Sequence, residues 1–374
     1  MKRIAIFCDG AWNGLDRRRE TSVLRLARAV PPTAPDGTKQ VGIYLPGVSA
    51  GRGSAGVVLG LDRLFGAAFG WGLTETIEEA FRALIFIHEP GDEIHILGFS
   101  RGAYTARSLA GLIRAAGIPL RAQAAAIPEA IAHYRARGPE THPNAEVSFR
   151  FRLRVSPHLV TSPEEAAWRR GTGAPEAPLL KVAYLGVWDT VGALGLPGVF
   201  GSLTRLVNRQ YAFHDADLTR LVAAARHAVA LDERRRFHPP TLWENLDMLN
   251  GGAEGEARRY LQLWFPGNHG IVGGSGGVPG LGAAAALWIA QGAAAEGLAF
   301  EPGTLEALAD EADPLADGAP LAQRAGPVNL LGLWLADRDG PDRADDVSAT
   351  ARARVAGLPA YRPASLRRVL DALA

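Results

Sequence analysis

A serine between two glycines is the feature of this sequence with the clearest chemical use. The pattern Gly-x-Ser-x-Gly occurs three times, around Ser49, Ser100 and Ser275. Between a strand and a helix, this pattern forms a sharp turn that lifts the hydroxyl clear of a sheet, where it can act as a nucleophile. The chain contains 44 glycines, so the pattern alone discriminates poorly. The elements on either side must decide which copy is meaningful.

Only the copy around Ser100 has a strand before it and a helix after it. Residues 93–97, which read Glu-Ile-His-Ile-Leu, are predicted as a strand, and residues 101–116 have apolar side chains at helical spacing. Ser49 is followed by a glycine-rich stretch, and Ser275 lies in a run of four glycines. Glycine does not favour a helix. The sequence therefore predicts Ser100 as the nucleophile, with its glycine neighbours, Gly98 and Gly102, leaving room in a crowded turn.

A nucleophilic serine needs a base, and the base needs an acid that orients it. Among nine histidines, His269 follows the predicted strand at 260–265 after a tight turn, Pro266-Gly267-Asn268, and precedes glycine. Such a loop at the carboxyl end of a strand is where α/β enzymes place their chemistry. A loop histidine bound only to backbone is the alternative. Asp189 ends the run at 182–187, and we favour it as the acid. Asp232 is the reserve acid, although an aspartate beside arginines more often forms an ion pair.

The loop after the first strand is the candidate for stabilising an oxyanion. The sequence there reads Asp9-Gly10-Ala11. The backbone N–H groups of Gly10 and Ala11 could join that of Arg101 in an oxyanion hole, which is usually a large catalytic contribution. Asp9 is a candidate for facing the substrate, and a turn or capping role is the alternative.

An apolar stretch at 51–71 is a candidate surface for lipid. It contains Leu64 and Phe65, and its charged residues are few. An exposed apolar patch beside an active site would bind acyl chains or a membrane surface. The alternative is a segment that covers the sheet like any helix.

Strands and helices alternate along the chain, which favours a parallel sheet covered on both faces. We therefore expect an α/β fold of the α/β-hydrolase type, as a single domain over 1–374. The predicted strands are 4–7, 41–45, 93–97, 182–187 and 260–265, and the predicted helices are 73–88, 101–116 and 217–231.

Two stretches interrupt the alternation. Residues 120–180 form an insertion, either a cap over the active site or a surface excursion that completes the fold. Residues 300–345 are rich in Ala, Asp, Gly and Pro, and we expect an irregular surface segment there. A final helix is predicted near 363–373.

Composition excludes several functional classes. The formal net charge is +1, which gives no electrostatic footprint for nucleic acid. The single cysteine, Cys8, excludes an intramolecular disulfide and a thiolate metal cage. Ligands do not cluster at metal spacing, so we expect no metal and no organic cofactor. The chain shows neither a secretory signal nor an uncharged span of bilayer length. We expect a cytoplasmic protein, or one exported without a signal peptide.

The ordered motifs resemble those of a bacterial α/β-hydrolase family catalogued as domain of unknown function 2235, which includes phospholipase effectors of the type VI secretion system. The similarity covers nearly the whole chain and is weakest in 120–178 and 300–345. Its motifs stand at 7–13, 90–92, 98–107, 186–192, 230–235, 264–269 and 361–363.

The resemblance implies a triad of Ser100, Asp189 and His269 acting on acyl esters, phospholipids among them. It also implies a phospholipid substrate, contact with a membrane surface and a secretion or immunity partner. Two departures concern this site. Ala11 replaces the family's usual threonine, which removes a hydroxyl but keeps a backbone donor. Gly270-Ile271 replaces Ser-Asp, which removes an acidic side chain. A small-substrate carboxylesterase or thioesterase, and a non-catalytic binding module or toxin scaffold, are the alternatives.

Overall fold

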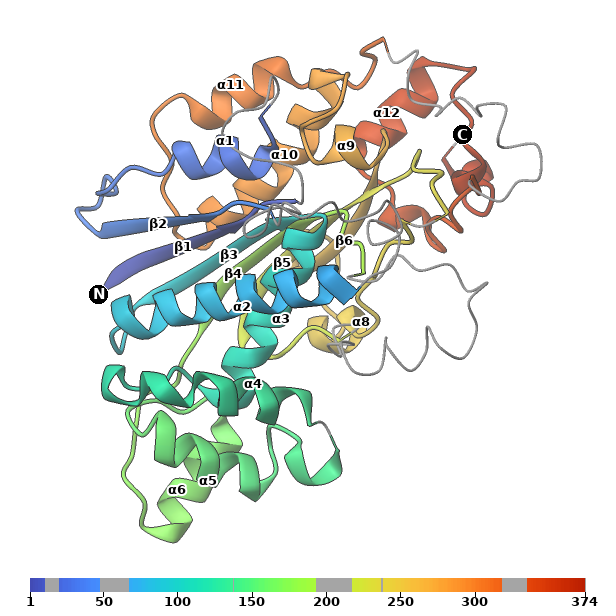
Figure 1. Ribbon diagram of the computed structural model, residues 1–374. Coiled ribbons are helices and arrows are strands. Elements are labelled where there is room, and N and C mark those ends of the chain that lie inside the picture. The colour runs from blue at the N-terminus through green and yellow to red at the C-terminus, as the bar shows by residue number, and fades with distance from the viewer. Residues whose placement is uncertain are drawn as a thin grey trace, which may run out of the picture.

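A computed structural model describes seven stretches of the chain (Figure 1). They are residues 1–10, 20–47, 67–136, 138–192, 217–236, 238–317 and 335–373. The predicted apolar segment at 51–71, with Leu64 and Phe65, lies largely outside the described residues, as does Ala11.

The centre of the fold is a six-stranded sheet in the order β2-β1-β3-β4-β5-β6. Every neighbouring pair of strands is parallel. The α/β class predicted from the alternating pattern is therefore confirmed. From β1 the chain adds β2 on one side of the sheet and β3 to β6 on the other. In sheets of this kind, ligands bind beyond the carboxyl ends of the two strands where the direction changes, here β1 and β3. The strands are β1 (Lys2–Cys8), β2 (Lys39–Leu45), β3 (Glu93–Phe99), β4 (Val182–Trp188), β5 (Val222–Ala230) and β6 (Tyr260–Phe265).

Helices cover both faces of the sheet and enclose two apolar cores (Figure 1). On one face lie α2 (Ala67–Ile87) and α3 (Arg101–Ala116), whose apolar side chains pack on β1, β3 and β4. On the other face lie α1 (Ser22–Arg28), α10 (Pro279–Ala295) and α11 (Thr304–Glu311). The sheet is thus covered on both sides, which explains why most residues of its strands are apolar.

The helix predicted over 217–231 is wrong, because β5 occupies this stretch. Alanine has the highest helix propensity, and β5 is rich in alanine. Tertiary context overrides that preference, since β5 pairs along its length with β4 on one side and β6 on the other. Small side chains also suit this position, because α10, itself rich in alanine, packs against β4 and β5.

The inserted helices pack at the end of α3 that is remote from Ser100. They are α4 (Ile127–Arg135), α5 (Glu146–Val155) and α6 (Pro163–Thr172), and they form the lowest layer in Figure 1. From α5, the buried Arg152 donates to the carbonyl oxygen of Ala115 near the carboxyl end of α3, at 2.9 Å. The described part of the insertion thus packs at the carboxyl end of α3. It does not cap Ser100, which precedes the amino end of that helix.

The C-terminal part of the chain is more regular at its start, and less regular at its end, than the sequence indicates. Helix α11 lies within the stretch expected to be irregular, and its Leu308 is buried in the core. The predicted final helix is replaced by two 3-10 turns, Ala364–Leu366 and Leu370–Ala372. Before them, α12 (Ala349–Gly357) packs its Ala351 and Val355 in an apolar cluster beside β6.

Two further helices are short. They are α8 (Leu246–Asn250) and α9 (His269–Val272). Over the described stretches, no helix is both long enough and apolar enough to cross a bilayer.

Candidate active site

Ser100 occupies a strained turn between β3 and α3. Its φ of 60° and ψ of −122° lie outside the regions that L-residues favour. Such a conformation costs about 1–3 kcal/mol and persists only where the surroundings enforce it. A Cβ on Gly98 would stand 2.4 Å from the carbonyl oxygen of Gly102, and one on Gly102 would stand 2.1 Å from that of Cys8. The predicted reason for both glycines, lack of space, is therefore confirmed.

His269 lies within hydrogen-bonding distance of the Ser100 hydroxyl. The distance from Nε2 to Oγ is 2.8 Å. His269 is the first residue of α9, and the preceding Asn268 caps this helix by accepting from the N–H of Ile271. The imidazole ring also packs on Phe99, with ring centroids 4.7 Å apart. The predicted convergence of Ser100 and His269 is present in the structure.

Asp189 contacts the other nitrogen of the same imidazole. Its Oδ2 lies 2.6 Å from Nδ1 of His269, and its Oδ1 accepts from the N–H of Ala230 at 2.9 Å. The carboxylate follows β4 directly and is completely buried. Since Asp189 accepts at Nδ1, the proton of a neutral imidazole belongs on Nδ1, and Nε2 is left to accept from Ser100.

The reserve acid, Asp232, lies behind the histidine loop and does not touch the imidazole. It follows strand β5, not a helix, and its Oδ2 accepts from the N–H of Gly267 at 2.6 Å and from the hydroxyl of Tyr361 at 2.8 Å. Its neighbour Glu233 accepts from the N–H of His269 at 3.2 Å. Asp232 and Glu233 therefore hold the backbone of the turn that presents His269. The arginine ion pair that we expected for Asp232 is made instead by Glu233, which binds Arg235 at 2.9 Å.

Arg338 is a site residue that the sequence did not reveal. Its guanidinium donates to Oδ1 of Asp189 at 2.6 Å and to Oδ2 at 3.0 Å. Arg338 stands in a polar run, Asp337 to Gly340, which has the composition of an exposed loop. No spacing links it to Asp189, 149 residues earlier. Glu233 was also missed, although it lies beside Asp232 in one of the family motifs.

These contacts determine the charge of Asp189. Burial raises the pKa of its carboxyl. The positive charge of Arg338 and the hydrogen bonds from His269 and Arg338 outweigh burial and hold the pKa well below its usual range. Asp189 is therefore a carboxylate at neutral pH. His238 packs edge-on against His269, with ring centroids 5.5 Å apart, and burial lowers its pKa to about 4, so this neighbour is neutral.

The loop after β1 approaches the serine turn, but Asp9 faces inward. Its side chain is 4% exposed and accepts from the hydroxyls of Thr21 and Tyr44, each at 2.7 Å. The expected substrate-facing role is therefore wrong for Asp9, which anchors the loop as a turn residue. Gly10, expected to supply an oxyanion donor, gives its N–H to Oδ1 of Asp9 at 2.6 Å.

The Gly-x-Ser-x-Gly copy around Ser275 does not compete with Ser100 in the structure. Ser275 lies between α9 and α10, where its hydroxyl donates to the carbonyl oxygen of Gly270 at 3.4 Å. Ser49 lies outside the described residues.

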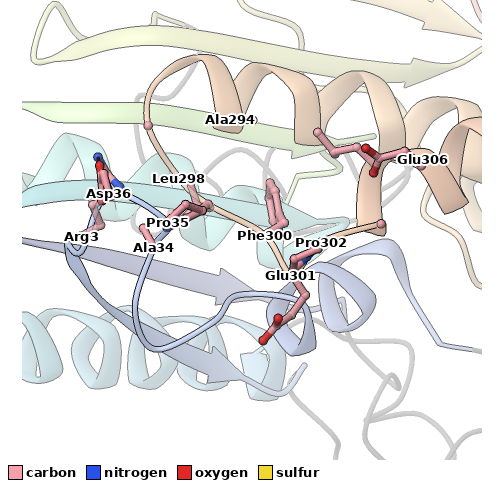
Figure 2. Close-up of a pocket in the computed structure, with 14 residues that line it drawn as sticks. Arg3, Ala34, Pro35, Asp36, Ala294, Leu298, Phe300, Glu301, Pro302 and Glu306 are labelled. Carbon is pink, nitrogen blue, oxygen red and sulfur yellow. Dashed lines mark hydrogen bonds and ion pairs between the residues drawn. The ribbon is translucent and has the colours of Figure 1, made fainter.

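A surface hollow of about 470 Å³ lies beside the amino end of β1, whereas Ser100 follows the carboxyl end of β3 (Figure 2). Arg3, at the amino end of β1, and Asp36 form an ion pair on its wall. Leu298, Phe300 and Pro302 contribute apolar surface. It is remote from the strand ends that carry Ser100, and it adds nothing to the triad. Among the described residues, no group of three or more His, Cys, Asp or Glu is arranged to hold a metal ion.

Three known proteins share parts of this sequence or fold. The uncharacterised protein YEL023C of Saccharomyces cerevisiae is 26% identical over 241 residues, which are 63% of this chain and 31% of the yeast protein. A crystal structure of an uncharacterised protein from Pseudomonas aeruginosa aligns with a TM-score of 0.45 and 17% identity, covering 83% of this chain and 48% of that one. The Tle1 effector bound to the VgrG spike of the type VI secretion system aligns with a TM-score of 0.42 and 17% identity, covering 74% and 52%. This chain thus spans about a third to a half of each.

A family model gives the firmer assignment. The model for the catalytic domain of Tle1-like phospholipase effectors of the type VI secretion system matches residues 2–291. The matched region includes Ser100, Asp189 and His269 and ends before Arg338. The match covers well over half of the chain, and the chain therefore belongs to the family of Tle1-like phospholipase effector catalytic domains.

Proposed function

We propose that this protein is a serine hydrolase that cleaves acyl esters, phospholipids among them, through Ser100, His269 and Asp189. The observation that carries the proposal is the unbroken chain of hydrogen bonds from the Ser100 hydroxyl through His269 to Asp189, at 2.8 and 2.6 Å. Nucleophile, orienting acid and base, which are Ser100, Asp189 and His269, follow one another along the sequence in the order found in α/β-hydrolases.

The geometry supports a two-step reaction. Nε2 of His269 accepts the Ser100 proton as Oγ attacks the ester carbonyl carbon. The tetrahedral intermediate then collapses, the imidazolium protonates the departing alcohol, and an acyl-enzyme remains. In the second step His269 takes a proton from water. The resulting hydroxide attacks the acyl carbon, and Ser100 leaves with its proton restored. Asp189 stays ionised and stabilises the imidazolium in both steps.

The developing oxyanion requires donors close to Ser100. Arg101 begins α3, and the positive end of a helix dipole stabilises negative charge near the first turn of the helix. The backbone of Arg101 is therefore the proposed oxyanion donor at this point. Because Gly10 donates to Asp9, Arg101 and Ala11 are the donors that the proposal retains.

Family membership supports a phospholipid as the substrate class. The family model describes phospholipase effectors, and its matched region contains the whole triad. Contact with a membrane surface and recognition by a secretion or immunity partner are predictions on the same ground. A soluble esterase or thioesterase and a non-catalytic module are the alternatives that the experiment must separate.

The test compares vesicles of phosphatidylcholine with a short p-nitrophenyl ester. Wild type should release fatty acid from the vesicles, and Ser100→Ala should not. Hydrolysis of the short ester alone would replace the phospholipase by a small-substrate esterase. If neither substrate is cleaved by a folded wild type, the proposed function is wrong and the binding module is favoured.

A further inference from the structure

The segment that carries Arg338 is attached directly to the edge of the active site. Leu335 forms an antiparallel bridge with Arg235, and the N–H of Ala336 donates to the carbonyl oxygen of Arg234 at 2.8 Å. Arg234 and Arg235 follow Glu233, which holds the backbone of His269. The C-terminal part of the chain, outside the matched family region, therefore reaches the residues that support the histidine loop.

The Arg338 guanidinium makes four hydrogen bonds. Two go to the carboxylate of Asp189, as described above, and two go to the carbonyl oxygens of Ala230 at 2.8 Å and His238 at 2.7 Å. Ala230 in turn donates its N–H to Asp189. The side chain of Arg338 is 5% exposed. A planar fork in this setting fixes the position of both carboxylate oxygens, which a single point charge cannot do.

The pair has an electrostatic consequence for the base. A buried carboxylate with no other partner would strongly favour the protonated, positively charged form of His269. An imidazolium cannot accept the Ser100 proton. Arg338 balances the charge of Asp189 and thereby offsets this preference, while the carboxylate still orients the imidazole. Within the described part of the chain, the other ionisable groups facing the ring are Glu233, which Arg235 pairs, and His238.

We propose that Arg338 is a positioning residue of the active site, which orients Asp189 and, through it, sets the pH range in which His269 acts as a base. This inference rests on the proposed hydrolase function. It adds a fourth residue to the triad, supplied by the C-terminal part of the chain.

The test measures the pH dependence of two reactions, hydrolysis of a short p-nitrophenyl ester and labelling by a fluorophosphonate. Arg338→Gln should move the acidic limb of both profiles upward by about one pH unit or more. Activity at neutral pH should fall, with partial recovery at higher pH. Arg338→Lys keeps the positive charge but loses the two-point contact of the guanidinium with Asp189. It should therefore leave the acidic limb of each pH profile near its wild-type position and lower the rate at every pH.

The matched control is Arg354→Gln. Arg354 is a second buried arginine of the C-terminal part of the chain, and it donates to the carbonyl oxygens of Pro314 and Ala316 at 2.7 and 3.0 Å. Its loss should lower the melting temperature without moving the limb. A limb that moves equally in both variants would overturn the proposal.

The Asp189→Asn background provides the second arm, because it removes the group through which Arg338 acts. In this background Arg338→Gln should change the labelling rate less than twofold. It should also cost less stability than in the wild-type background, since Asp189→Asn has already removed the carboxylate that balances the buried guanidinium. If Arg338→Gln lowers the rate by the same factor with and without Asp189, the proposal is overturned. A folded wild type that is neither labelled nor active would instead overturn the proposed function itself.

Discussion

At the scale of single residues, the proposed hydrolysis depends on Ser100, His269 and Asp189 acting as one unit. Their types could be predicted from the sequence because each stands at a strand end that tight turns make recognisable. The contacts of Asp9 and Gly10 could not be predicted, because a turn motif does not say which way its side chain points. Arg338 could not be predicted either, because its partner, Asp189, is remote in the sequence and is reached only through the folded C-terminal segment.

The first prediction concerns Ser100 and His269. Ser100→Ala and His269→Ala should each abolish nearly all hydrolysis, and the double variant should lose little more, because nucleophile and base work only together. Steady-state kinetics with a short ester measure this. Ser275→Ala is the matched control and should be close to wild type. Losses that multiply in the double variant would show that the two residues act independently.

The second prediction concerns Asp189. Asp189→Asn should lower kcat by about four orders of magnitude, because an amide at this place favours the wrong imidazole tautomer. The variant should fold, as the sequence indicates, but the structure adds a cost in stability. Arg338 loses its partner, and breaking a buried pair costs about 3–5 kcal/mol. Chemical denaturation measures that cost. An unchanged free energy of unfolding would contradict the buried pair, and an unchanged kcat would remove Asp189 from the triad.

At the scale of elements, the site could be predicted from short motifs at the ends of strands better than from the pattern of whole segments. The strand–turn–helix at Ser100 could be predicted because the apolar run, the glycines and the helical spacing agree. Strand β5 was missed because its alanines favour a helix in isolation, and only pairing with β4 and β6 makes them a strand. The sequence indicates an insertion at 120–180 but does not predict its three helices, and their position below α3 depends on long-range contacts such as that of Arg152.

The third prediction tests the crowding at the serine turn. Gly98→Ala forces a Cβ against the carbonyl oxygen of Gly102, and overpacking of this kind costs about 1–3 kcal/mol of folding free energy. Ester hydrolysis should fall with it, because the turn that presents Ser100 must shift. The matched control is Gly171→Ala in α6, where a Cβ has no neighbour within 4 Å. This change should stabilise the protein by up to about 1 kcal/mol. A Gly98→Ala variant as stable and active as wild type would contradict the packing described.

At the scale of the whole molecule, the sheet buries ionisable groups far from the active site. His95 in β3 is fully buried, and within the described part of the chain neither ring nitrogen has a hydrogen-bond partner. Burial, with smaller contributions from Arg3 and Lys181, lowers the pKa of His95 to about 3. The folded state thus keeps His95 neutral, whereas an unfolded chain protonates a histidine near pH 6.5.

The fourth prediction follows from that difference. The contribution of His95 to stability is complete above about pH 6.5 and is lost as the pH falls from there toward 3, because only the unfolded state binds the proton in this range. His95→Leu should therefore reduce the slope of unfolding free energy against pH by about 1.4 kcal/mol per pH unit. Urea denaturation between pH 4 and 6 measures it. The exposed His142→Leu is the control and should keep the wild-type slope. Parallel curves for wild type and His95→Leu would contradict the prediction.

The most direct measurement for the whole molecule is covalent labelling by a fluorophosphonate, followed by mass spectrometry of the modified peptide. A fluorophosphonate reacts with a serine that a neighbouring base activates, and the serine oxygen displaces fluoride. We predict one adduct per wild-type chain, located on Ser100, present in Ser275→Ala and absent in Ser100→Ala. A folded wild type that acquires no adduct, or an adduct that persists in Ser100→Ala, would contradict Ser100 as the activated nucleophile.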